Sequence, residues 1–434
     1  MKSLVLAEKP SVARDIARVL GCHKNISGAI EGSNYIVTWA LGHLVTLADP
    51  EEYDKKFKAW DMSYLPMVPK KWELVVIKQT SKQYHNVKTQ LFRKDVSEII
   101  IATDAGREGE LVARWILDKS GCHKPIRRLW ISSVTDKAIK EGFAHLKDGR
   151  AYNDLYHAAR SRAEADWLVG INATRALTCK YNAQLSCGRV QTPTLSMIAH
   201  REQQIRSFKP EDYYGLRCTT SVTGGSVGTM ASIVTWTWQQ KKSGSLRSFN
   251  KDLITGLDKK LKNQTLTVTD VHTSSKRTPS PGLYDLTELQ RDANKRFGFS
   301  AKETLNIMQS LYEHHKVLTY PRTDSRYIGT DIVPTIKERL KACNIGPYKK
   351  YIPELLKKPL KTSKTFVDDK KVSDHHAIIP TEEYVQMEHM SNNERKIYDL
   401  VVRRFISVLY PAFEYEQTTL KAEAAGETFT AKGK

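Results

Sequence analysis

The first 150 residues alternate short apolar runs with segments in which apolar residues recur at helical spacing. Residues 3–7 and 98–103 have the pattern of buried strands, residues 35–40 and 72–77 are further strands, and residues 11–20 and 109–117 are helices. Near-continuous apolar strands followed by helices are typical of a mostly parallel sheet covered on both faces. We therefore predict one α/β domain over residues 1–150.

The pattern changes after residue 150. Residues 151–210 are helical in character and rich in Arg and Ala, whereas residues 211–281 favour β structure. Within that β stretch, Leu266, Val268 and Asp270 alternate with threonines and predict a strand with two different faces. The stretch ends in SSKRTPSP, residues 274–281, whose composition predicts a linker.

Helical patterns return over residues 282–405. Three pairs match the capping box that opens a helix: Thr287 with Gln290, Ser300 with Glu303, and Ser391 with Glu394. The third precedes a stripe of Ile397, Val401 and Phe405. Residues 406–434 alternate again and stop without a closing turn. The pattern as a whole predicts a multidomain protein with an α/β part, α parts and β parts, whose second β portion is shortened.

Composition narrows the choice of partners and compartment. At 434 residues the chain is too long for one core. Its 68 Lys and Arg against 48 Asp and Glu give a net charge of +20, which makes nucleic acid the leading partner, with the ribosome or an acidic surface as rivals. The six cysteines form no C-x-x-C pair, which argues against a zinc ribbon or disulfide framework and fits a reduced cytosol. We expect no signal peptide, membrane span or anchor.

Acidic side chains follow two of the predicted strands. Glu8 and Lys9 come after the first strand, and Asp104 and Glu108 come after the strand at 98–103. Residues just past the carboxyl ends of parallel strands converge on one crevice. Clustered carboxylates would suit Mg²⁺ and phosphoryl-transfer chemistry, with Lys9 to neutralise a phosphate or protonate a leaving oxygen. The plainer alternative is that Asp104 and Glu108 only favour a helix N-terminus.

Three further segments carry polar groups suited to phosphate. Tyr320 stands before a proline and two residues before Arg322, so it could act as a nucleophile whose phosphate the arginine holds; an exposed loop tyrosine is the alternative. Residues 186–194 combine a glycine turn with Arg, Gln and hydroxyl groups, which bind phosphate and sugar, or form only a polar loop. The adjacent His375 and His376 would more readily contact a phosphate than share a metal ion.

Taken together, these segments resemble the type IA DNA topoisomerases. LVLAEKPSVARDIA and IIIATDAGREGELVARWI look like the two halves of a Toprim metal site. ARSRAEADWLVGINATR, SCGRVQTPTL, LYEHHKVLTYPRTDSRYI and DHHAIIPT look like the family's other signatures, in the family's order. Glu followed by Lys, and the HHAIIPT form, resemble bacterial topoisomerase III more than topoisomerase I.

The resemblance implies a role for each matching residue. Tyr320 would form a 5′-phosphotyrosyl bond, Arg322 would stabilise the transition state, and Lys9 would protonate the departing 3′ oxygen. Glu8 would act in catalysis and, with Asp104 and Glu108, would handle Mg²⁺, while His375 would support the scissile phosphate. The implied contacts to single-stranded DNA are Ser186, Cys187, Gly188, Arg189, Val190, Gln191, Arg162, Arg175, His43 and Arg322.

The resemblance also implies a fold and an activity. A Rossmann-like Toprim domain I (1–150) would be followed by domain IV (151–210), domain II (211–281), domain III with the tyrosine (282–405) and an incomplete return through domain II (406–434). The family forms a toroidal arch, so we expect a C-terminally truncated arch in which cleavage and rejoining are less affected than strand passage. The implied enzyme is an ATP-independent isomerase, cytoplasmic and nucleoid-associated, that relaxes negative supercoils and decatenates DNA, with a RecQ-like helicase as a further partner.

One departure and two rival functions follow from the same residues. Gly106 replaces the middle acid of the family's Asp-x-Asp-x-Glu, which should weaken metal binding without abolishing function. A Toprim primase or nuclease would explain the carboxylates but leave Tyr320 unused. A non-catalytic basic DNA-binding protein would explain Gly106 as lost activity. Tyr320→Phe separates the three functions.

Overall fold

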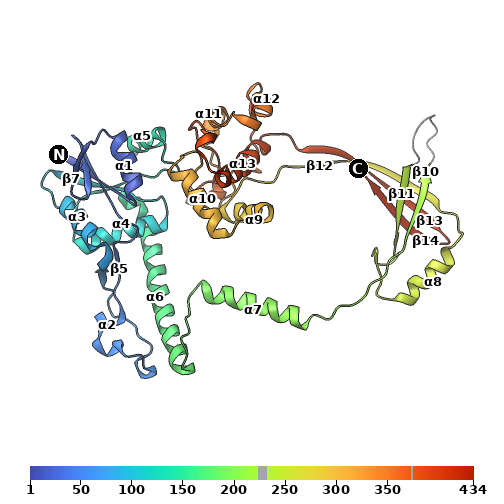
Figure 1. Ribbon diagram of the computed structural model, residues 1–434, viewed down its shortest axis with the longest axis horizontal. Helices are drawn as coiled ribbons and strands as arrows, with labels where there is room; N and C mark the ends of the chain where they lie inside the picture. Colours follow the sequence, from blue (N-terminus) through green and yellow to red (C-terminus); the bar gives the residue numbers. More distant parts are fainter. Residues whose placement is uncertain (223–231, 373–374) are drawn as a thin grey trace. The chain divides into compact units, whose positions relative to one another are not determined.

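The computed structural model describes residues 1–222, 232–372 and 375–434, and the chain forms two compact units (Figure 1). Unit 1 comprises Met1–Ser196 and Pro281–Tyr410, and unit 2 comprises Met197–Ser280 and Pro411–Lys434. The five-part division drawn from the sequence is finer than these two units and stays a prediction. Within the described residues, no helix is both long enough and apolar enough to cross a membrane.

The main sheet of unit 1 has strand order β2-β3-β4-β1-β7-β8-β9, with β1 at its centre. β1 runs parallel to β4 and β7, and β7 runs parallel to β8, as the apolar strand sequences predict, but β2–β3, β3–β4 and β8–β9 are antiparallel, so the sheet is parallel only at its centre. Leu4, Val5, Leu6 and Ala7 of β1 are all fully buried. The strands span Lys2–Ala7 (β1), Lys24–Ile26 (β2), Ala29–Glu31 (β3), Tyr35–Trp39 (β4), Val96–Ala102 (β7), Ile126–Arg128 (β8) and Lys147–Asp148 (β9).

Helices cover both faces of this sheet, as predicted. Leu4 and Leu6 face the helices α3 and α4, whereas Val5 and Ala7 face α1 and α5. The predicted strand at 72–77 exists only as β6, which pairs with β5 in a separate two-stranded sheet because Leu74–Val76 aligns with Val45–Leu47. The helices span Pro10–Val19 (α1), Ser81–Leu91 (α3), Arg107–Ser120 (α4) and Asp136–Ala144 (α5).

The rest of unit 1 consists of helices joined by irregular segments. Ser300 caps α10, and Ser391 with Glu394 forms a full capping box on α13, as predicted. The box proposed for Thr287 is wrong, because Asp285 caps α9 by accepting from the Glu288 amide. The helices span Asn153–Tyr181 (α6), Gln191–Ser207 (α7, which continues into unit 2), Leu286–Phe297 (α9), Ala301–Glu313 (α10), Ile336–Ala342 (α11), Ile352–Leu356 (α12) and Asn392–Ser407 (α13).

The α/β part and the helical part of unit 1 have separate apolar cores. The buried clusters around the sheet use residues up to Trp167, and the cluster around α10 and α13 uses only residues from Leu283 onward. Polar contacts join the two parts: Lys9–Glu313 (2.7 Å), Lys316–Asp15 (2.6 Å), Lys137–Glu338 (2.6 Å), Thr135–Glu382 (2.7 Å) and the Tyr320 amide to the Ser132 carbonyl (3.1 Å). We call this set of contacts the polar seam.

Unit 2 is a five-stranded sheet of order β10-β11-β14-β13-β12 with the helix α8 packed on its core, a helix that the β-leaning sequence did not indicate. The linker predicted at 274–281 is wrong for its first half, because β12 runs to Thr278 in continuous pairing with β13. A register shift between Val268 and Asp270 interrupts the predicted alternation, and Val268 is exposed. The elements span Arg217–Val222 (β10), Ser232–Gln239 (β11), Lys251–Leu261 (α8), Thr267–Thr278 (β12), Phe413–Ala424 (β13) and Glu427–Gly433 (β14).

Candidate active site

The carboxyl ends of β1 and β7 lie side by side and bring two acids together. Ala7 and Ala102 are register partners, so the residues that follow them leave the sheet at the same edge. There the Glu8 Oε2 atom accepts a hydrogen bond of 3.1 Å from the Asp104 amide. Burial, with the Asp104 charge second, raises the pKa of Glu8 to about 7, and burial also raises the pKa of Asp104. A cation would relieve this repulsion, so the pair fits a divalent metal ion.

The Glu8 shift gives a testable dependence of stability on pH without metal. In the folded protein the pKa of Glu8 is about 7, above the value of 4.5 for a free Glu. Protonated Glu8 therefore makes its full contribution to the free energy of unfolding below pH 4.5, and this contribution is lost as the pH rises through 7. Relative to Glu8→Gln, the wild-type protein should lose up to about 3 kcal/mol of unfolding free energy over that window. Urea unfolding in EDTA measures it, and parallel pH profiles of the two proteins would contradict it.

Tyr320 lies over these acids. Its hydroxyl donates a hydrogen bond of 3.2 Å to Asp104 Oδ2, although 216 positions separate the two in sequence. Its ring stacks on His375 at a centroid distance of 4.2 Å and meets Tyr312 edge-on at 5.5 Å. Burial, followed by the charges of Asp104 and Glu8, raises the pKa of Tyr320 far above its usual range. The phenol is therefore protonated at neutral pH, and its proton points at a carboxylate that can accept it.

Lys9 is held by residues that the sequence reasoning missed. Its ammonium group forms an ion pair of 2.7 Å with Glu313 Oε1, and the Gln309 side chain donates to the same carboxylate oxygen. Gln309 and Glu313 are spaced i, i+4 on α10, just before Tyr320 in sequence. This spacing is the only feature of the sequence that could have indicated that Gln309 and Glu313 act together. The arrangement fixes the direction of the lysine in the cleft.

His375 and Arg322 are the groups beside Tyr320 with unused hydrogen-bonding capacity. His375 is only 5% exposed, and neither ring nitrogen has a hydrogen-bond partner within the described residues. Burial, with the neighbouring His376 second, lowers the pKa of His375 to about 4, so its ring is neutral. Arg322 is exposed at the cleft, where no ion pair or hydrogen bond within the described part of the chain engages it. Asp374, which precedes His375 in the quoted motif, lies outside the described residues.

Glu108 lies in the same cleft but faces away from the other acids. Its carboxylate is 3.3 Å from Arg162 Nη1 and 3.9 Å from His43 Nε2. Among residues 1–222, 232–372 and 375–434, no three His, Cys, Asp or Glu side chains are grouped as metal ligands. The structure thus brings Glu8 and Asp104 together and leaves Glu108 paired with two basic side chains. The cleft has a volume of about 940 Å³ and contains Glu8, Asp104, Glu108, Tyr320, Arg322 and His375.

The loop of residues 186–191 is tied to the same α6 face as Arg162. Arg189 Nε lies 2.5 Å from Asp166, which lies 4.0 Å from Arg162 on α6. The Cys187 amide donates to Thr174 Oγ1 at 2.9 Å, and Gln191 donates to Ser186 at 3.2 Å. Ser186 and Val190 are exposed, and Gly188 is half-buried. The loop presents a basic and polar surface beside the cleft.

Arg175 has a different environment from the other predicted DNA contacts. It is 7% exposed, and its Nη1 atom donates to the carbonyls of Phe57 at 2.5 Å and Ala59 at 3.5 Å. Its guanidinium also lies 5.1 Å from the centroid of the Trp60 ring. The Arg175 guanidinium is therefore engaged inside the protein and is not part of the basic surface beside the cleft.

Comparison with known proteins adds independent information. The DNA topoisomerase family matches residues 150–434, and the Toprim domain family matches residues 3–134. DNA topoisomerase 3 of Bacillus cereus is 63% identical and that of Bacillus subtilis is 60% identical, each over 433 residues. These alignments cover 100% of this chain and 58% of each relative. The structure of full-length topoisomerase I from Thermotoga maritima, 22% identical, aligns with a TM-score of 0.69 over 99% of this chain and 64% of that one.

Proposed function

The chain belongs to the type IA DNA topoisomerase family, and from that premise we propose that it cuts one DNA strand through Tyr320, keeps the cut end as a 5′-phosphotyrosyl ester, and reseals it after another strand has passed. The observation that carries this proposal is the 3.2 Å hydrogen bond from the Tyr320 hydroxyl to Asp104. A nucleophile next to a proton acceptor is the arrangement that covalent catalysis requires. A Toprim primase or nuclease would have no use for this tyrosine.

The side chains around Tyr320 suggest how each proton moves during strand cleavage. The Tyr320 oxygen attacks the scissile phosphorus, and its proton passes to the Asp104 carboxylate. The bond between phosphorus and the 3′ oxygen breaks, and that oxygen takes a proton from Lys9, which Glu313 orients at 2.7 Å. Arg322 and the neutral His375 donate hydrogen bonds to the phosphate oxygens as charge develops. Resealing reverses each step, so the bond energy is conserved and ATP is not required.

Mg²⁺ is the proposed cofactor. The close pair of buried carboxylates, Glu8 and Asp104, fits a hard divalent cation, and Glu108 joins them if it exchanges its ion pair with Arg162. When bound, the ion neutralises the acids and the nearby phosphate.

Restoring an acid at position 106 should strengthen metal binding. Gly106 has extended backbone angles (φ 177°, ψ 176°) that any residue adopts, and a Cβ there would meet nothing nearer than His375 Nε2 at 4.0 Å. We expect Gly106→Asp to lower the Mg²⁺ concentration for half-maximal cleavage by about tenfold, because ligand charge sets affinity. Titration calorimetry measures binding directly, with Gly106→Asn as the uncharged control. Equal Mg²⁺ affinities of the Gly106→Asp and Gly106→Asn variants would exclude a metal role for this position.

The DNA contacts that the geometry supports are those beside the cleft: His43, Arg162, Arg189 and the polar atoms of residues 186–191. We propose that this surface holds a single-stranded segment by its backbone. The chain spans 58% of the length of the Bacillus relatives. Relaxation, decatenation, a RecQ-like helicase partner and association with the nucleoid in the cytoplasm are therefore proposals that rest on the family.

A labelling experiment tests the proposed chemistry. Wild-type protein, Mg²⁺ and a single-stranded oligonucleotide labelled at either end are mixed and quenched with denaturant. A 5′-phosphotyrosyl bond leaves the 3′-labelled fragment on the protein and frees the 5′-labelled one. The reverse pattern would overturn the assigned polarity, free fragments with both labels would indicate a nuclease, and intact DNA despite binding would indicate a non-catalytic binder.

A further inference from the structure

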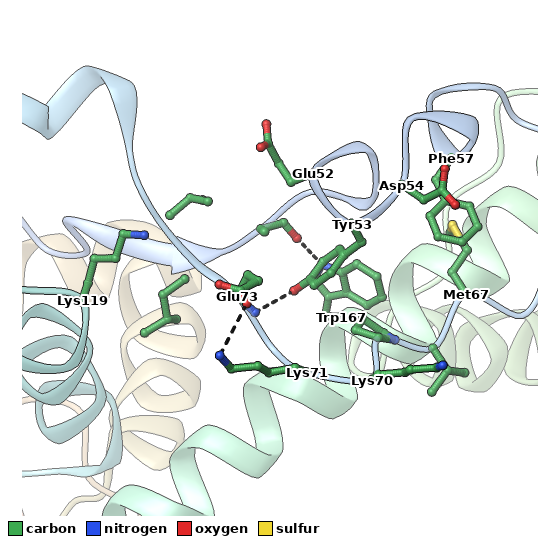
Figure 2. A pocket seen from close by; sticks show the side chains of 15 residues that line it. Glu52, Tyr53, Asp54, Phe57, Met67, Lys70, Lys71, Glu73, Lys119 and Trp167 are labelled. Carbon is green, nitrogen blue, oxygen red and sulfur yellow. Dashed lines mark hydrogen bonds and ion pairs between the residues drawn. The ribbon is translucent and has the colours of Figure 1, made fainter. Parts of the chain in front are cut away.

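Residues 48–75 form an arm that leaves the α/β part of unit 1 and packs along α6. Four polar contacts anchor it: the Trp167 indole donates to the Ala48 carbonyl (2.9 Å), Asn172 bonds both the amide and the carbonyl of Met67 (2.6 and 2.9 Å), and Arg175 binds the Phe57 carbonyl. Tyr53 and Trp72 meet the Trp167 ring edge-on. Figure 2 shows Tyr53 and Trp167 together at the base of the arm, in a cleft of about 680 Å³. The arm is thus fixed on α6.

The outer side of this anchored arm exposes apolar side chains. Trp60 is 52% exposed, Met62 is 49% exposed and Val68 is 66% exposed. The Trp60 ring has the Arg175 guanidinium at 5.1 Å from its centroid, which supports the ring without enclosing it. Short segments around it are the helix α2 (Pro50–Tyr53) and the 3-10 helices η1 (Lys55–Lys58) and η2 (Met62–Tyr64). A tryptophan held half in water by fixed neighbours is a preorganised platform for stacking.

Lysines are frequent in the sequence on both sides of this platform. Residues 55–71 carry Lys55, Lys56, Lys58, Lys70 and Lys71 against a single acid, Asp61. Lys70 and Lys71 also line the cleft at the base of the arm, where Lys119 at the end of α4 joins them (Figure 2). The acids Asp49, Glu51, Glu52 and Asp54 precede this stretch and Glu73 follows it; Asp54 pairs with Lys56, and Glu73 pairs with Lys71. Residues 55–60 carry three lysines and no acid, so the positive charge that suits a polyanion is confined to this run beside Trp60.

We propose that the arm is a second binding surface for single-stranded DNA, on which Trp60 stacks with an unpaired base while Lys55, Lys56 and Lys58 contact phosphates. Stacking on an aromatic ring needs a base free of its partner, whereas lysines follow the backbone without reading sequence. The arm packs on the α6 face of Trp167 and Arg175, about 160° around the helix from the face of Arg162 and Asp166, of which Arg162 lines the cleavage cleft. That DNA is the partner rests on the proposed function; the arm adds a DNA contact outside the cleft that contains Tyr320.

Fluorescence anisotropy tests this surface by measuring the affinity for labelled oligothymidylates. The two oligonucleotides have about 8 and about 30 nucleotides, lengths that bracket common single-strand site sizes. Trp60→Ala should weaken binding of the long strand about tenfold with an unchanged salt slope, and Trp60→Phe should restore most of it. Replacing Lys55, Lys56 and Lys58 with alanine should lower the slope of log K against log salt by about 2, since each phosphate contact contributes about 0.7. Binding of the short strand should not change.

Matched controls separate the arm from general effects. Tyr384→Ala removes another exposed aromatic ring, and alanine at Lys349, Lys350 and Lys357 removes three exposed charges elsewhere; both should leave affinity within twofold, about the spread of unrelated surface changes. In the wild-type protein, photocrosslinking with iodouracil DNA should label residues 55–71. Unchanged long-strand affinity in folded Trp60→Ala, absence of that crosslink, or equal competition by duplex DNA or polyglutamate would overturn the proposal. Absence of the covalent adduct in the protein with Tyr320 intact would contradict the proposed cleavage but not DNA binding by the arm. The two proposals are therefore tested separately.

Discussion

Replacing Tyr320 with phenylalanine should abolish the covalent adduct and leave the protein folded and able to bind DNA. The hydroxyl makes one hydrogen bond, to Asp104, whereas the ring keeps its contacts with His375 and Tyr312. Removing a nucleophile lowers the rate of the chemical step at least about 10⁴-fold, because the remaining catalytic groups have no attacking oxygen to activate. Adduct formation in denaturant measures the loss, and thermal unfolding with oligonucleotide binding checks that the fold persists.

Tyr312 provides the matched control for that substitution. Its ring lies against Tyr320 and its side chain is buried, so Tyr312→Phe removes a neighbouring hydroxyl from the same environment. We expect this variant to form the adduct within about tenfold of the wild-type rate, as for a change that spares the reacting groups. An adduct that persists in Tyr320→Phe, or disappears in Tyr312→Phe alone, would assign the chemistry to another residue.

Replacing Glu110 with glutamine should destabilise the protein by about 3–5 kcal/mol, the cost of leaving a buried charge without its partner. Glu110 and Arg128 are both fully buried and pair at 3.0 Å. Burial lowers the pKa of Arg128, so the site disfavours a guanidinium without a partner charge. The midpoint of urea unfolding at neutral pH measures the effect.

The same arginine fixes the backbone of the candidate active site. Its two Nη atoms donate to the carbonyls of Thr103 at 2.8 Å and Asp104 at 2.7 Å. Glu110→Gln should therefore also weaken cleavage at saturating Mg²⁺, since the Asp104 turn loses its support. Glu108→Gln is the control on the same helix: its carboxylate is exposed, so stability should change by less than about 0.5 kcal/mol. Equal unfolding midpoints for both variants would contradict the prediction.

Local patterns predicted the parts of the site that follow directly from strands. The apolar runs of β1 and β7 indicated where Glu8 and Asp104 would meet, and the Ser391 box marked the start of α13. Contacts between distant segments left no such pattern. Lys9 and Glu313 are 304 positions apart, and the buried role of Arg175 depends on carbonyls of the arm. The strand at 274–278 was missed because pairing with β13, not its own polar composition, makes it β structure.

The polar seam of unit 1 has a consequence for motion. Separating two parts that share an apolar core would expose hydrocarbon to water and cost free energy in proportion to its area. Separating parts joined by an exposed ion pair such as Lys137–Glu338 lets water solvate each released charge, so the net cost of breaking that pair is about 1 kcal/mol or less. Tyr320 belongs to one side of this seam and Asp104 to the other. Under the proposed function, Tyr320 would therefore move away from Asp104 with the bound DNA end while each part keeps its own apolar core.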